Sequence, residues 1–393
     1  MKLAIVASHP VQYQVPWYRA LAERPEVDLT VYYALLPTPA QQGVGFGVEF
    51  AWDVPLLDGY RWKALPNVAR SPSLGRFFGS RTPAVGTILE RDRPGAVIVA
   101  GWHALPLLQA IRACGRLGLP CLVRGESSGL RPRPAWVRAV HRRLLSRFDA
   151  FLAIGEANRR FYRSHGVPGE RVFTAPYFAD GSRFREQDAR LRPRREEIRR
   201  QWGIAEEDVC FLFAGKLVAK KRPLDLLRAC DLARREEASI RALVAGAGEM
   251  ERETKRLAAR LELPATFTGF LNQSEISRAY VAADCLVLPS DYGETWGLVV
   301  NEAMHHGLPA AVSDRVGCGP DLVEDGITGR VFPCADVEAL ARVLVETARD
   351  REGRGAMGRR ARRRVARYSA ERAVEGTLEA AAFVTRSLQG VEA

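Results

Sequence analysis

The sequence contains no long uncharged hydrophobic run. None of its apolar stretches reaches the roughly 18 residues that a helix needs to cross a membrane. The apolar start at residues 1–7 gives way at once to Ser8-His9-Pro10. Such a short run is typical of a buried first strand and is too brief for the apolar region of a signal peptide. We therefore expect no membrane-spanning helix, and a cytoplasmic protein that at most rests on the inner face of a membrane.

Cysteines are few and follow no pattern. The seven cysteines are scattered over the 393 residues, and no C-x-x-C occurs. An odd number without regular spacing does not fit a disulfide framework. The pattern favours small apolar cysteines in a reducing compartment. At this length we expect two domains, because a single core stops growing at about 250–300 residues.

Positive charge is concentrated in one stretch. The net charge is +12, and residues 130–200 hold 18 Arg, no Lys and 8 Asp or Glu. Within this stretch residues 134–147 predict a helix with an apolar face of core type, made of Trp136, Val137, Val140, Leu144 and Leu145, and with Arg138, His141, Arg142 and Arg143 on the other faces. Three explanations stay open: a solvated face, docking on an anionic membrane, and binding to nucleic acid. The last is disfavoured because no nucleic-acid-binding motif accompanies the charge.

Short apolar runs alternate with helical patterns in both halves of the chain, which predicts α/β domains with parallel sheets. The predicted strands are residues 2–7, 28–33, 96–100, 121–124, 150–154 and 172–175 in the first half, and 209–214, 241–245, 266–268, 285–288, 310–312 and 329–332 in the second. Residues 36–80, rich in Pro, Gly and aromatics, interrupt the first series and predict loop. We expect domains at 1–180 and 181–370, and a C-terminal helix at 371–393 that packs back toward the first domain.

Two familiar nucleotide motifs are missing from the second half. The strand at 209–214 ends in Gly215-Lys216, with Lys221 further on, but no GKS or GKT follows, which argues against a Walker loop. The next strand ends in a Gly-x-Gly at Gly246, where the third glycine of a dinucleotide fingerprint is replaced by Glu251. A dehydrogenase is therefore disfavoured. Lysines at the end of a parallel strand remain candidates for a diphosphate.

Two glutamates bracket the next segment, Glu294-Thr-Trp-Gly-Leu-Val-Val-Asn-Glu302. The segment begins in a polar turn after the strand at 285–288 and predicts a helix that ends at Gly307, with Pro309 beyond. The first N–H groups of such a helix are unpaired and favour an anion. Glu302 would lie about 12 Å along the axis from Glu294. The two carboxylates therefore suit two parts of one long ligand rather than one atom.

The order of these motifs resembles the retaining family 4 glycosyltransferases of GT-B fold. The motifs are Gly-Lys-Leu-x4-Lys-Arg-Pro, Ala-Gly-x-Gly-Glu, Phe-Thr-Gly-Phe270, Gly-Glu-Thr-Trp-Gly-Leu-Val-Val-Asn-Glu-Ala-Met and Asp314-Arg-Val-Gly-Cys-Gly-Pro-Asp-Leu-Val-Glu-Asp-Gly-Ile-Thr-Gly329, and they cover nearly all of residues 205–335. The resemblance implies two Rossmann-like domains that face each other across a cleft. It weakens in the first half, where such enzymes bind their different acceptors.

The resemblance also implies roles for individual residues around a nucleotide diphosphate-sugar. Glu302 would bind the ribose hydroxyls, and Glu294 the hydroxyls of the transferred sugar. Lys216, where the family usually has Arg, and Lys221 would neutralise the diphosphate leaving group. The remaining contacts to the donor are predicted at Gly246, Phe270, Gly297, Leu298 and Val299.

The acceptor side is less clear from the sequence. The glycine pair that relatives often carry after the first strand is absent, and Ser8-His9-Pro10 stands there instead. Glu126 falls near the place where relatives have a catalytic-site histidine, and His103 follows the preceding strand. Either side chain can orient or deprotonate an acceptor hydroxyl. The sequence leaves the choice between them open.

The resemblance predicts transfer of a hexose-type sugar from a UDP- or GDP-linked donor to a hydroxyl acceptor, in the synthesis of a surface glycan, a glycolipid or a glycosylated metabolite. No cofactor is implied. No D-x-D occurs, so a metal clamp is not expected, and His305 and His306 are predicted on a helix surface rather than at a metal. The alternatives are a GT-B phosphorylase, a sugar-nucleotide epimerase, and a non-catalytic sugar-nucleotide-binding or polysaccharide-binding protein. A role in nucleic-acid binding is the weakest.

Overall fold

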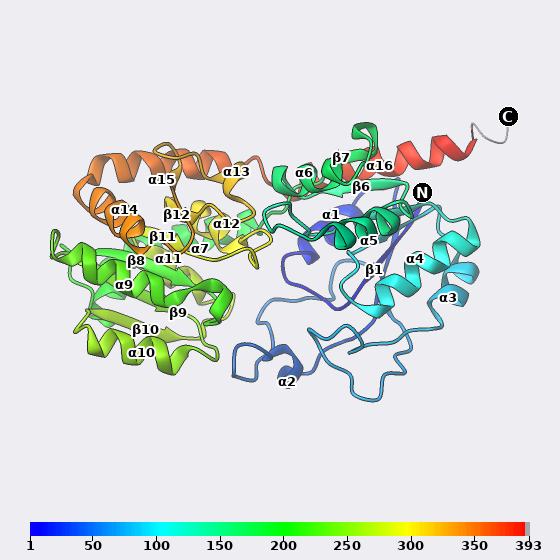
Figure 1. The fold of residues 1–393 in the computed structure, drawn as a ribbon. Helices are drawn as coiled ribbons and strands as arrows, with labels where there is room; N and C mark the ends of the chain where they lie inside the picture. Colours follow the sequence, from blue (N-terminus) through cyan, green and yellow to red (C-terminus); the bar gives the residue numbers. More distant parts are fainter. Residues whose placement is uncertain (390–393) are drawn as a thin grey trace. The chain divides into compact units, whose positions relative to one another are not determined.

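The computed structural model describes residues 1–389 and divides the chain into two compact units, each built on one parallel sheet (Figure 1). Of the described residues, unit 1 comprises Met1–Gln42, Phe50–Tyr177 and Ala370–Gln389, and unit 2 comprises Gly43–Glu49 and Phe178–Ser369. The end of the predicted C-terminal helix, residues 390–393, lies outside the described residues. The main change of unit therefore falls between Tyr177 and Phe178, and a short piece of the first half belongs to unit 2.

Unit 1 has a seven-stranded sheet in the order β3-β2-β1-β4-β5-β6-β7. Its strands are β1 (Lys2–Ala7), β2 (Asp28–Tyr33), β3 (Trp62–Ala64), β4 (Ala96–Val99), β5 (Cys121–Val123), β6 (Ala150–Ala153) and β7 (Val172–Thr174). Its helices are α1 (Val15–Ala22), α2 (Pro39–Gln42), α3 (Val85–Asp92), α4 (Leu105–Leu117), α5 (Ala135–Leu145), α6 (Glu156–Ser164) and α16 (Ala370–Gln389). The last helix, α16, packs on α1, β6 and β7 of this unit.

Unit 2 has a six-stranded sheet in the order β10-β9-β8-β11-β12-β13. Its strands are β8 (Val209–Ala214), β9 (Ile240–Ala245), β10 (Ala265–Gly269), β11 (Cys285–Leu288), β12 (Ala310–Ser313) and β13 (Gly329–Phe332). Its helices are α7 (Gly181–Leu191), α8 (Arg195–Gln201), α9 (Pro223–Arg234), α10 (Glu251–Arg260), α11 (Ile276–Ala282), α12 (Leu298–His305), α13 (Gly319–Leu322), α14 (Val337–Arg349) and α15 (Arg351–Val365).

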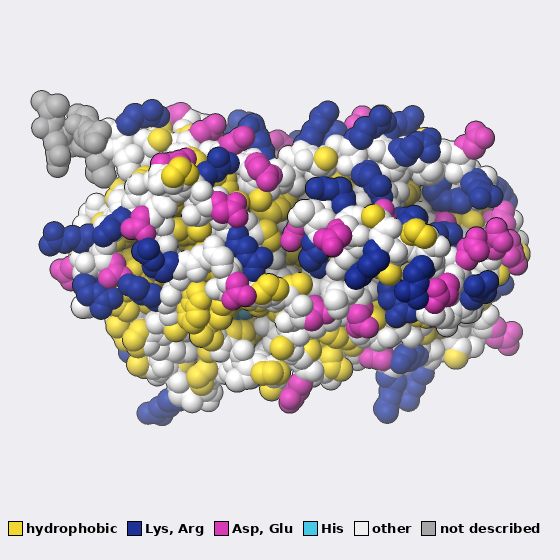
Figure 2. Space-filling model, turned by 180° about the vertical axis from the view of Figure 1, so that it is seen from behind, with side chains coloured by type: hydrophobic (Ala, Val, Ile, Leu, Met, Phe, Trp, Pro, Cys, Tyr) yellow, Lys and Arg dark blue, Asp and Glu magenta, His cyan; other side chains and the backbone are white. Residues whose placement is uncertain are grey.

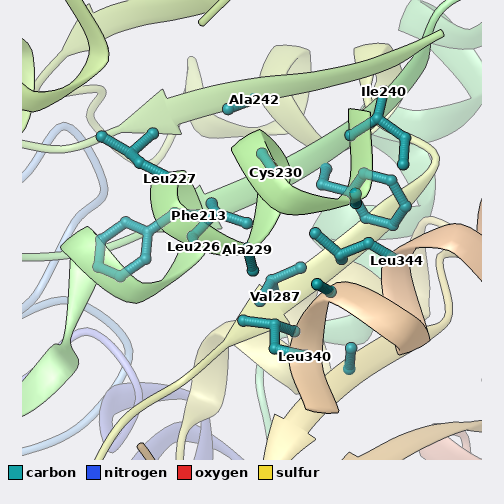
Figure 3. Close-up of a cluster of buried hydrophobic side chains, with 14 of the residues drawn as sticks. Phe213, Leu226, Leu227, Ala229, Cys230, Ile240, Ala242, Val287, Leu340 and Leu344 are labelled. Carbon is teal, nitrogen blue, oxygen red and sulfur yellow. The ribbon is translucent and has the colours of Figure 1, made fainter. Parts of the chain in front are cut away.

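The core of unit 2 fixes the strands that carry the candidate site. Side chains from β8, β9 and β11 pack against α9 and α14, and Figure 3 shows Phe213, Val287 and Leu340 among them. These strands are apolar along their whole length because helices cover both faces of a parallel sheet. Each fully buried Phe or Leu contributes about 1.5–3 kcal/mol. The core therefore holds the strand ends, and the loops after them, in one arrangement.

Every predicted strand forms, and the two parallel-sheet Rossmann-like domains are confirmed. The strand β3 was missed because Trp62–Ala64 has only three residues and lies at the sheet edge, inside a stretch predicted to be loop. Its pairing with β2 runs from Val31↔Trp62 to Tyr33↔Ala64. A short edge strand gains its stability from the neighbouring strand rather than from an apolar run of its own.

The predicted burial pattern of α5 is wrong at Trp136, Val140 and His141, whereas Leu145 is buried as expected. Trp136 and Val140 are 71% and 57% exposed, whereas His141 is only 8% exposed. The side of the helix that carries His141 is buried because the imidazole packs against Phe161 and His165, with ring centroids 5.5 Å apart in both cases. The helix therefore presents an aromatic and an aliphatic side chain to solvent among its arginines.

The charge of the surface is mixed. Figure 2 shows Lys and Arg side chains over much of one face, interspersed with Asp and Glu. Several charged side chains form ion pairs, for example Lys255 with Glu251 one helical turn away, at 2.7 Å. Among residues 1–389, no helix combines the length and the apolar character that crossing a membrane requires.

Candidate functional site

The candidate residues of unit 2 lie where the strand order reverses. The first strand of its sheet, β8, has β9 on one side and β11 on the other. In open parallel sheets, ligands bind outside the carboxyl ends of the strands at such a point. The loops that begin at Gly215 and Pro289 follow β8 and β11, so the fold brings Lys216, Lys221 and Glu294 to this point.

Glycine allows two of these loops to touch through their backbones. Gly246 follows β9 with φ +155°, and a Cβ at this position would lie 1.8 Å from the carbonyl oxygen of Gly215. A Cβ on Gly248 would lie 2.5 Å from the carbonyl oxygen of Leu217. Position 246 therefore requires glycine for a structural reason, because any side chain there would separate the loops after β8 and β9. The predicted contact of Gly246 with a donor stays a prediction.

Lys221 and Glu294 form a nearly buried ion pair. The Nζ of Lys221 lies 2.5 Å from Oε2 of Glu294, and the two side chains are 13% and 14% exposed. The hydroxyl of Ser290 donates to the same oxygen over 3.3 Å. The pair joins the loop after β8 to the loop after β11. Lys221, predicted to bind phosphate, and Glu294, predicted to bind the sugar, are therefore direct neighbours.

The pKa of the Glu294 carboxyl is set by two opposing effects. Burial raises it, but the charge of Lys221, its hydrogen bond, and the nearby Lys220 and Ser290 outweigh burial, so that the pKa lies below its ordinary value. Glu294 is therefore ionised at neutral pH. A carboxylate with an ordered cation beside it is a good acceptor for sugar hydroxyls.

Backbone hydrogen bonds order the loop that carries Glu294. The N–H of Asp291 donates to the carbonyl of Lys220 over 2.8 Å, and that of Gly317 donates to the carbonyl of Glu294 over 3.1 Å. The N–H of Cys318 donates to the carbonyl of Trp296 over 2.9 Å. The loop after β11 is thus held by the loops after β8 and β12 on its two sides. Such a support keeps the Glu294 side chain in one place.

The helix α12 begins at the end of this loop. Its N-cap, Gly297, has φ +102°, and Leu298 and Val299 form its half-buried first turn. Glu302 lies in its second turn and is 1% exposed, with the Tyr280 hydroxyl donating to its Oε2 over 2.6 Å. A buried carboxylate needs partners of this kind. Tyr280 comes from α11, and no motif in the sequence indicated it.

Lys216 has neighbours that the sequence did not indicate. Its Nζ donates to the carbonyl of Val44 over 3.1 Å and lies 4.5 Å from the centre of the Phe46 ring. Phe46 in turn packs edge-on against Phe270, with ring centroids 5.0 Å apart. Both Val44 and Phe46 belong to the piece of the first half that joins unit 2. The repeated glycines of Gly-Val-Gly-Phe-Gly were the available signal for an ordered turn.

The predicted exposure of the adjacent histidines is wrong. His305 and His306 are both 2% exposed, because α7 and α15 pack on α12 and Tyr280 of α11 lies beside His306. The His306 Nδ1 hydrogen-bonds the carbonyl of Glu302, and its ring lies 5.0 Å from that of Tyr280. Burial lowers the pKa of each histidine to about 4. Both are neutral packing residues around α12 at neutral pH.

In unit 1 the two acceptor-side candidates lie close together. The hydroxyl of Tyr177 donates to Glu126 Oε1. The pKa of His103 is lowered by burial of its ring, and the carboxylate of Glu126 opposes this shift. The two side chains follow β5 and β4, which are neighbours in the sheet. The structure thus places both candidates at one sheet edge without choosing between them.

A buried cation supports this part of unit 1. The Arg124 guanidinium is 6% exposed and lies 4.6 Å from the Trp17 ring and 4.7 Å from the Tyr177 ring. It also donates to the carbonyl of Pro176 over 3.2 Å. Burial lowers the pKa of Arg124, and burial raises that of Tyr177. Arg124 fixes Tyr177, and Tyr177 in turn orients Glu126.

The predicted residues therefore form two sets, each in the region that follows the carboxyl ends of the strands in one unit. The set of unit 2 consists of Lys216, Lys221, Gly246, Phe270, Glu294, Gly297, Leu298, Val299 and Glu302, and that of unit 1 of His103 and Glu126. Their roles stay predictions. Over the described part of the chain, no three His, Cys, Asp or Glu side chains gather in a way that could hold a metal ion.

Comparison with known proteins bears on these residues. Residues 194–364 match the family described as glycosyl transferases group 1. Over 70% of this chain it is 29% identical to the sulfoquinovosyl transferase SQD2 of Arabidopsis thaliana, and over 78% it is 28% identical to the D-inositol 3-phosphate glycosyltransferase of Nocardia farcinica. These matches span 51% and 65% of the two relatives' own lengths.

Solved structures share the fold at low sequence identity. The sucrose-phosphate synthase of Thermosynechococcus elongatus superimposes with a TM-score of 0.73 at 18% identity and covers 100% of both chains. Anabaena HepE, in complex with UDP and glucose, gives a TM-score of 0.69 at 16% identity and covers 99% of this chain and 100% of its own. The chain therefore has the GT-B fold, and its residues 194–364 are similar to the glycosyl transferases of group 1.

Proposed function

We propose that the protein is a retaining glycosyltransferase that moves a hexose-type sugar from a UDP- or GDP-linked donor to a hydroxyl acceptor. The observation that carries this proposal is the cluster of Lys216, Lys221 and Glu294 at the strand-order reversal of unit 2. Two cations suit a diphosphate, and an ionised, ordered carboxylate suits sugar hydroxyls. The family match covers this cluster.

In the proposed mechanism the protein acts mainly by stabilising the diphosphate leaving group. Cleavage of the bond between the sugar and the diphosphate leaves negative charge on the phosphate oxygens. Lys216, Lys221 and the positive end of the α12 dipole would stabilise that charge without rearranging. The departing phosphate would take the proton of the acceptor hydroxyl on the same face of the sugar, so no protein nucleophile is needed. Neither a metal nor a cofactor enters these steps.

Unit 1 would supply the acceptor side. We propose that Glu126 or His103 orients the attacking hydroxyl, and that Tyr177 holds Glu126 for this purpose. The choice is open to experiment, because Glu126→Gln keeps the size and the hydrogen bond of the side chain but removes its charge. If Glu126 orients the hydroxyl, this variant loses transfer while it still hydrolyses the donor. If His103 does so, His103→Asn shows that behaviour instead.

Turnover of candidate donors tests the proposal as a whole. We expect transfer from one UDP- or GDP-linked sugar to an alcohol, with retention at the anomeric carbon seen by proton NMR, and no loss in excess EDTA. Isomerised donor without acceptor would show an epimerase instead, and phosphate-dependent cleavage a phosphorylase. A donor that binds without any turnover, over a broad acceptor panel, would show a binding protein.

We further propose that a cytoplasmic form of the protein rests on the inner face of an anionic membrane through α5. The exposed Trp136 and Val140 stand on a helix that also carries Arg138, Arg142 and Arg143, and such a helix suits a lipid interface with negative headgroups. The protein would then be on the same membrane surface as an acceptor in a glycolipid or a surface glycan. The steep salt dependence of nucleic-acid binding is not expected.

Vesicle sedimentation tests this contact. We expect the protein to bind vesicles that contain phosphatidylglycerol and not those of phosphatidylcholine alone. Trp136→Ser should weaken the binding by roughly tenfold, since burial of an indole in the interface is lost. Val331→Ser, which changes a 37% exposed valine of unit 2, serves as the control. Equal sedimentation with both vesicles would contradict the proposal.

A further inference from the structure

The turn Gly43–Glu49 stands apart from the rest of the first half of the chain. The residues on both of its sides belong to unit 1, yet these seven residues pack within unit 2. The sequence predicts loop over the whole of residues 36–80. Its position beside Lys216 gives it a part in the proposed donor site.

The sequence of this turn forces its shape. The N–H groups of Phe46 and Gly47 both donate to the carbonyl of Gly43, over 2.9 and 3.2 Å. A Cβ on Gly43 would lie 2.0 Å from the carbonyl oxygen of Val48, so the turn closes only with glycine there. Gly45 adopts φ +86°, a left-handed conformation that other residues rarely take. The turn is therefore a defined element rather than a slack connection.

This element meets Lys216 on two sides. The carbonyl of Val44 accepts a hydrogen bond from Nζ over 3.1 Å, and the face of the Phe46 ring attracts the ammonium from 4.5 Å. A Cβ on Gly45 would lie 3.1 Å from Nζ, so the glycine permits the close approach. An edge-to-face contact with Phe270 gives the Phe46 ring a second neighbour, with ring centroids 5.0 Å apart. The ammonium is thus fixed by a dipole and by an aromatic face.

A fixed lysine differs from a mobile one in what it contributes. Lysine has a flexible stem of four carbons and loses much rotamer freedom when its ammonium is placed. An ammonium has three donors, of which Val44 takes one, so the group keeps donors for phosphate oxygens. Burial and the nearby Lys220 and Lys221 also lower the pKa of Lys216, which an arriving dianion would reverse.

We propose that Phe46 is a positioning residue, which holds the Lys216 ammonium in place for the diphosphate of the nucleotide donor. The inference rests on the proposed function. It adds that a segment from the first half of the chain completes the phosphate site of unit 2.

The experiment compares Phe46→Leu with Phe46→Tyr in the full chain. Leucine keeps the apolar bulk but removes the ring, whereas tyrosine keeps a ring face. We expect Phe46→Leu to weaken the binding of UDP or GDP by roughly threefold to tenfold, as the loss of a partly desolvated cation–π contact predicts. Phe46→Tyr should restore it. The matched control is Phe78→Leu, at a 72% exposed phenylalanine of unit 1.

Three further readings separate positioning from a merely structural role. Binding of the nucleoside monophosphate should change less than that of the diphosphate, because Lys216 is proposed to act on the diphosphate. The turnover number for the donor should fall as well as its apparent affinity, since the leaving group gains charge in the transition state. In a Lys216→Met background, Phe46→Leu should have no further effect, because the lysine is the group through which it acts.

Several results would overturn the inference. Unchanged affinity in Phe46→Leu would remove the role of the ring, and an equal loss in the Lys216→Met background would show that Phe46 acts through another group. Tighter binding in Phe46→Leu would mean that the turn competes with the donor. If the wild type binds no nucleotide at all, the proposed function fails and the inference with it. If it binds and the variants match it, the inference alone fails.

Discussion

Replacement of Lys221 by methionine removes one half of the ion pair that joins the loops after β8 and β11. Methionine approximates the length of the lysine stem, so the packing of the stem is largely kept. The change leaves Glu294 as a carboxylate that is 14% exposed and has lost a partner 2.5 Å away. The consequence for stability follows from that loss.

The size of the effect is bounded by the burial of the pair. Removal of one partner of a buried pair costs about 3–5 kcal/mol, because the other charge is left uncompensated. Glu294 keeps the hydrogen bond from Ser290, and both side chains retain some exposure to water. We therefore expect Lys221→Met to lower the free energy of unfolding by about 2–3 kcal/mol at pH 7, below the range for full burial.

The effect depends on pH with a definite sign. In the wild type the pKa of Glu294 is lowered, so the pair stabilises fully above the ordinary glutamate pKa of about 4.3 and is lost as the pH falls through the lower, folded value. In Lys221→Met burial raises that pKa instead. Glu294 then takes up a proton on mild acidification, and the difference between variant and wild type shrinks from pH 7 to pH 4.

Urea unfolding, followed by tryptophan fluorescence at both pH values, measures this difference. Lys255→Met is the matched control, since it removes an exposed ion pair whose side chains are 50% and 33% exposed. That pair should contribute less than about 0.5 kcal/mol. Equal effects of the two substitutions, or a Lys221→Met effect that does not change with pH, would refute the reasoning.

Two further predictions concern the fold around the site. Burial lowers the pKa of His305 and His306 to about 4, below the ordinary value of about 6.5, so on acidification the unfolded chain binds protons before the folded one does. The free energy of unfolding should therefore fall by roughly 3 kcal/mol for each histidine between pH 6.5 and pH 4. The double variant with His305→Gln and His306→Gln should show a smaller fall in urea titrations. Gly246→Ala should destabilise unit 2 by about 2–4 kcal/mol in thermal unfolding, because its Cβ would lie 1.8 Å from the Gly215 carbonyl oxygen. Gly269→Ala is the control and should destabilise it less, because no atom lies within 4 Å of a Cβ at that position. Equal losses at the two glycines would contradict this.

The sequence was a good guide to the strands and to unit 2. A parallel strand covered on both faces reads as an apolar run, as at 209–214 and 285–288. The residues at the ends of such strands follow from the strand positions. The direct pairing of Lys221 with Glu294 could not be predicted from the strand positions, because it depends on the side-chain rotamers of two loops that are far apart in the sequence.

Tertiary contacts decided the features that the sequence left open or that were predicted wrongly. Trp136 occupies a position typical of a core face, yet His141 takes the buried side because aromatic rings of α6 and its end surround it. His305 was predicted at the surface because the sequence does not show that several helices enclose the end of α12. The packing of the turn with Phe46 onto unit 2 is a long-range contact that no local pattern reveals.

Calorimetric titration with UDP- and GDP-linked sugars tests the central claim most directly. Glu302 lies in the second turn of α12, and Glu302→Gln keeps its size and an acceptor for the Tyr280 hydroxyl. We predict one saturable site for a nucleotide sugar in the wild type, and at least roughly tenfold weaker binding in Glu302→Gln, as the loss of charge-assisted hydrogen bonds to ribose requires. Glu206→Gln, an exposed change in the same unit, should bind as the wild type does. Absence of binding to any nucleotide sugar, or equal affinity in Glu302→Gln, would contradict the account.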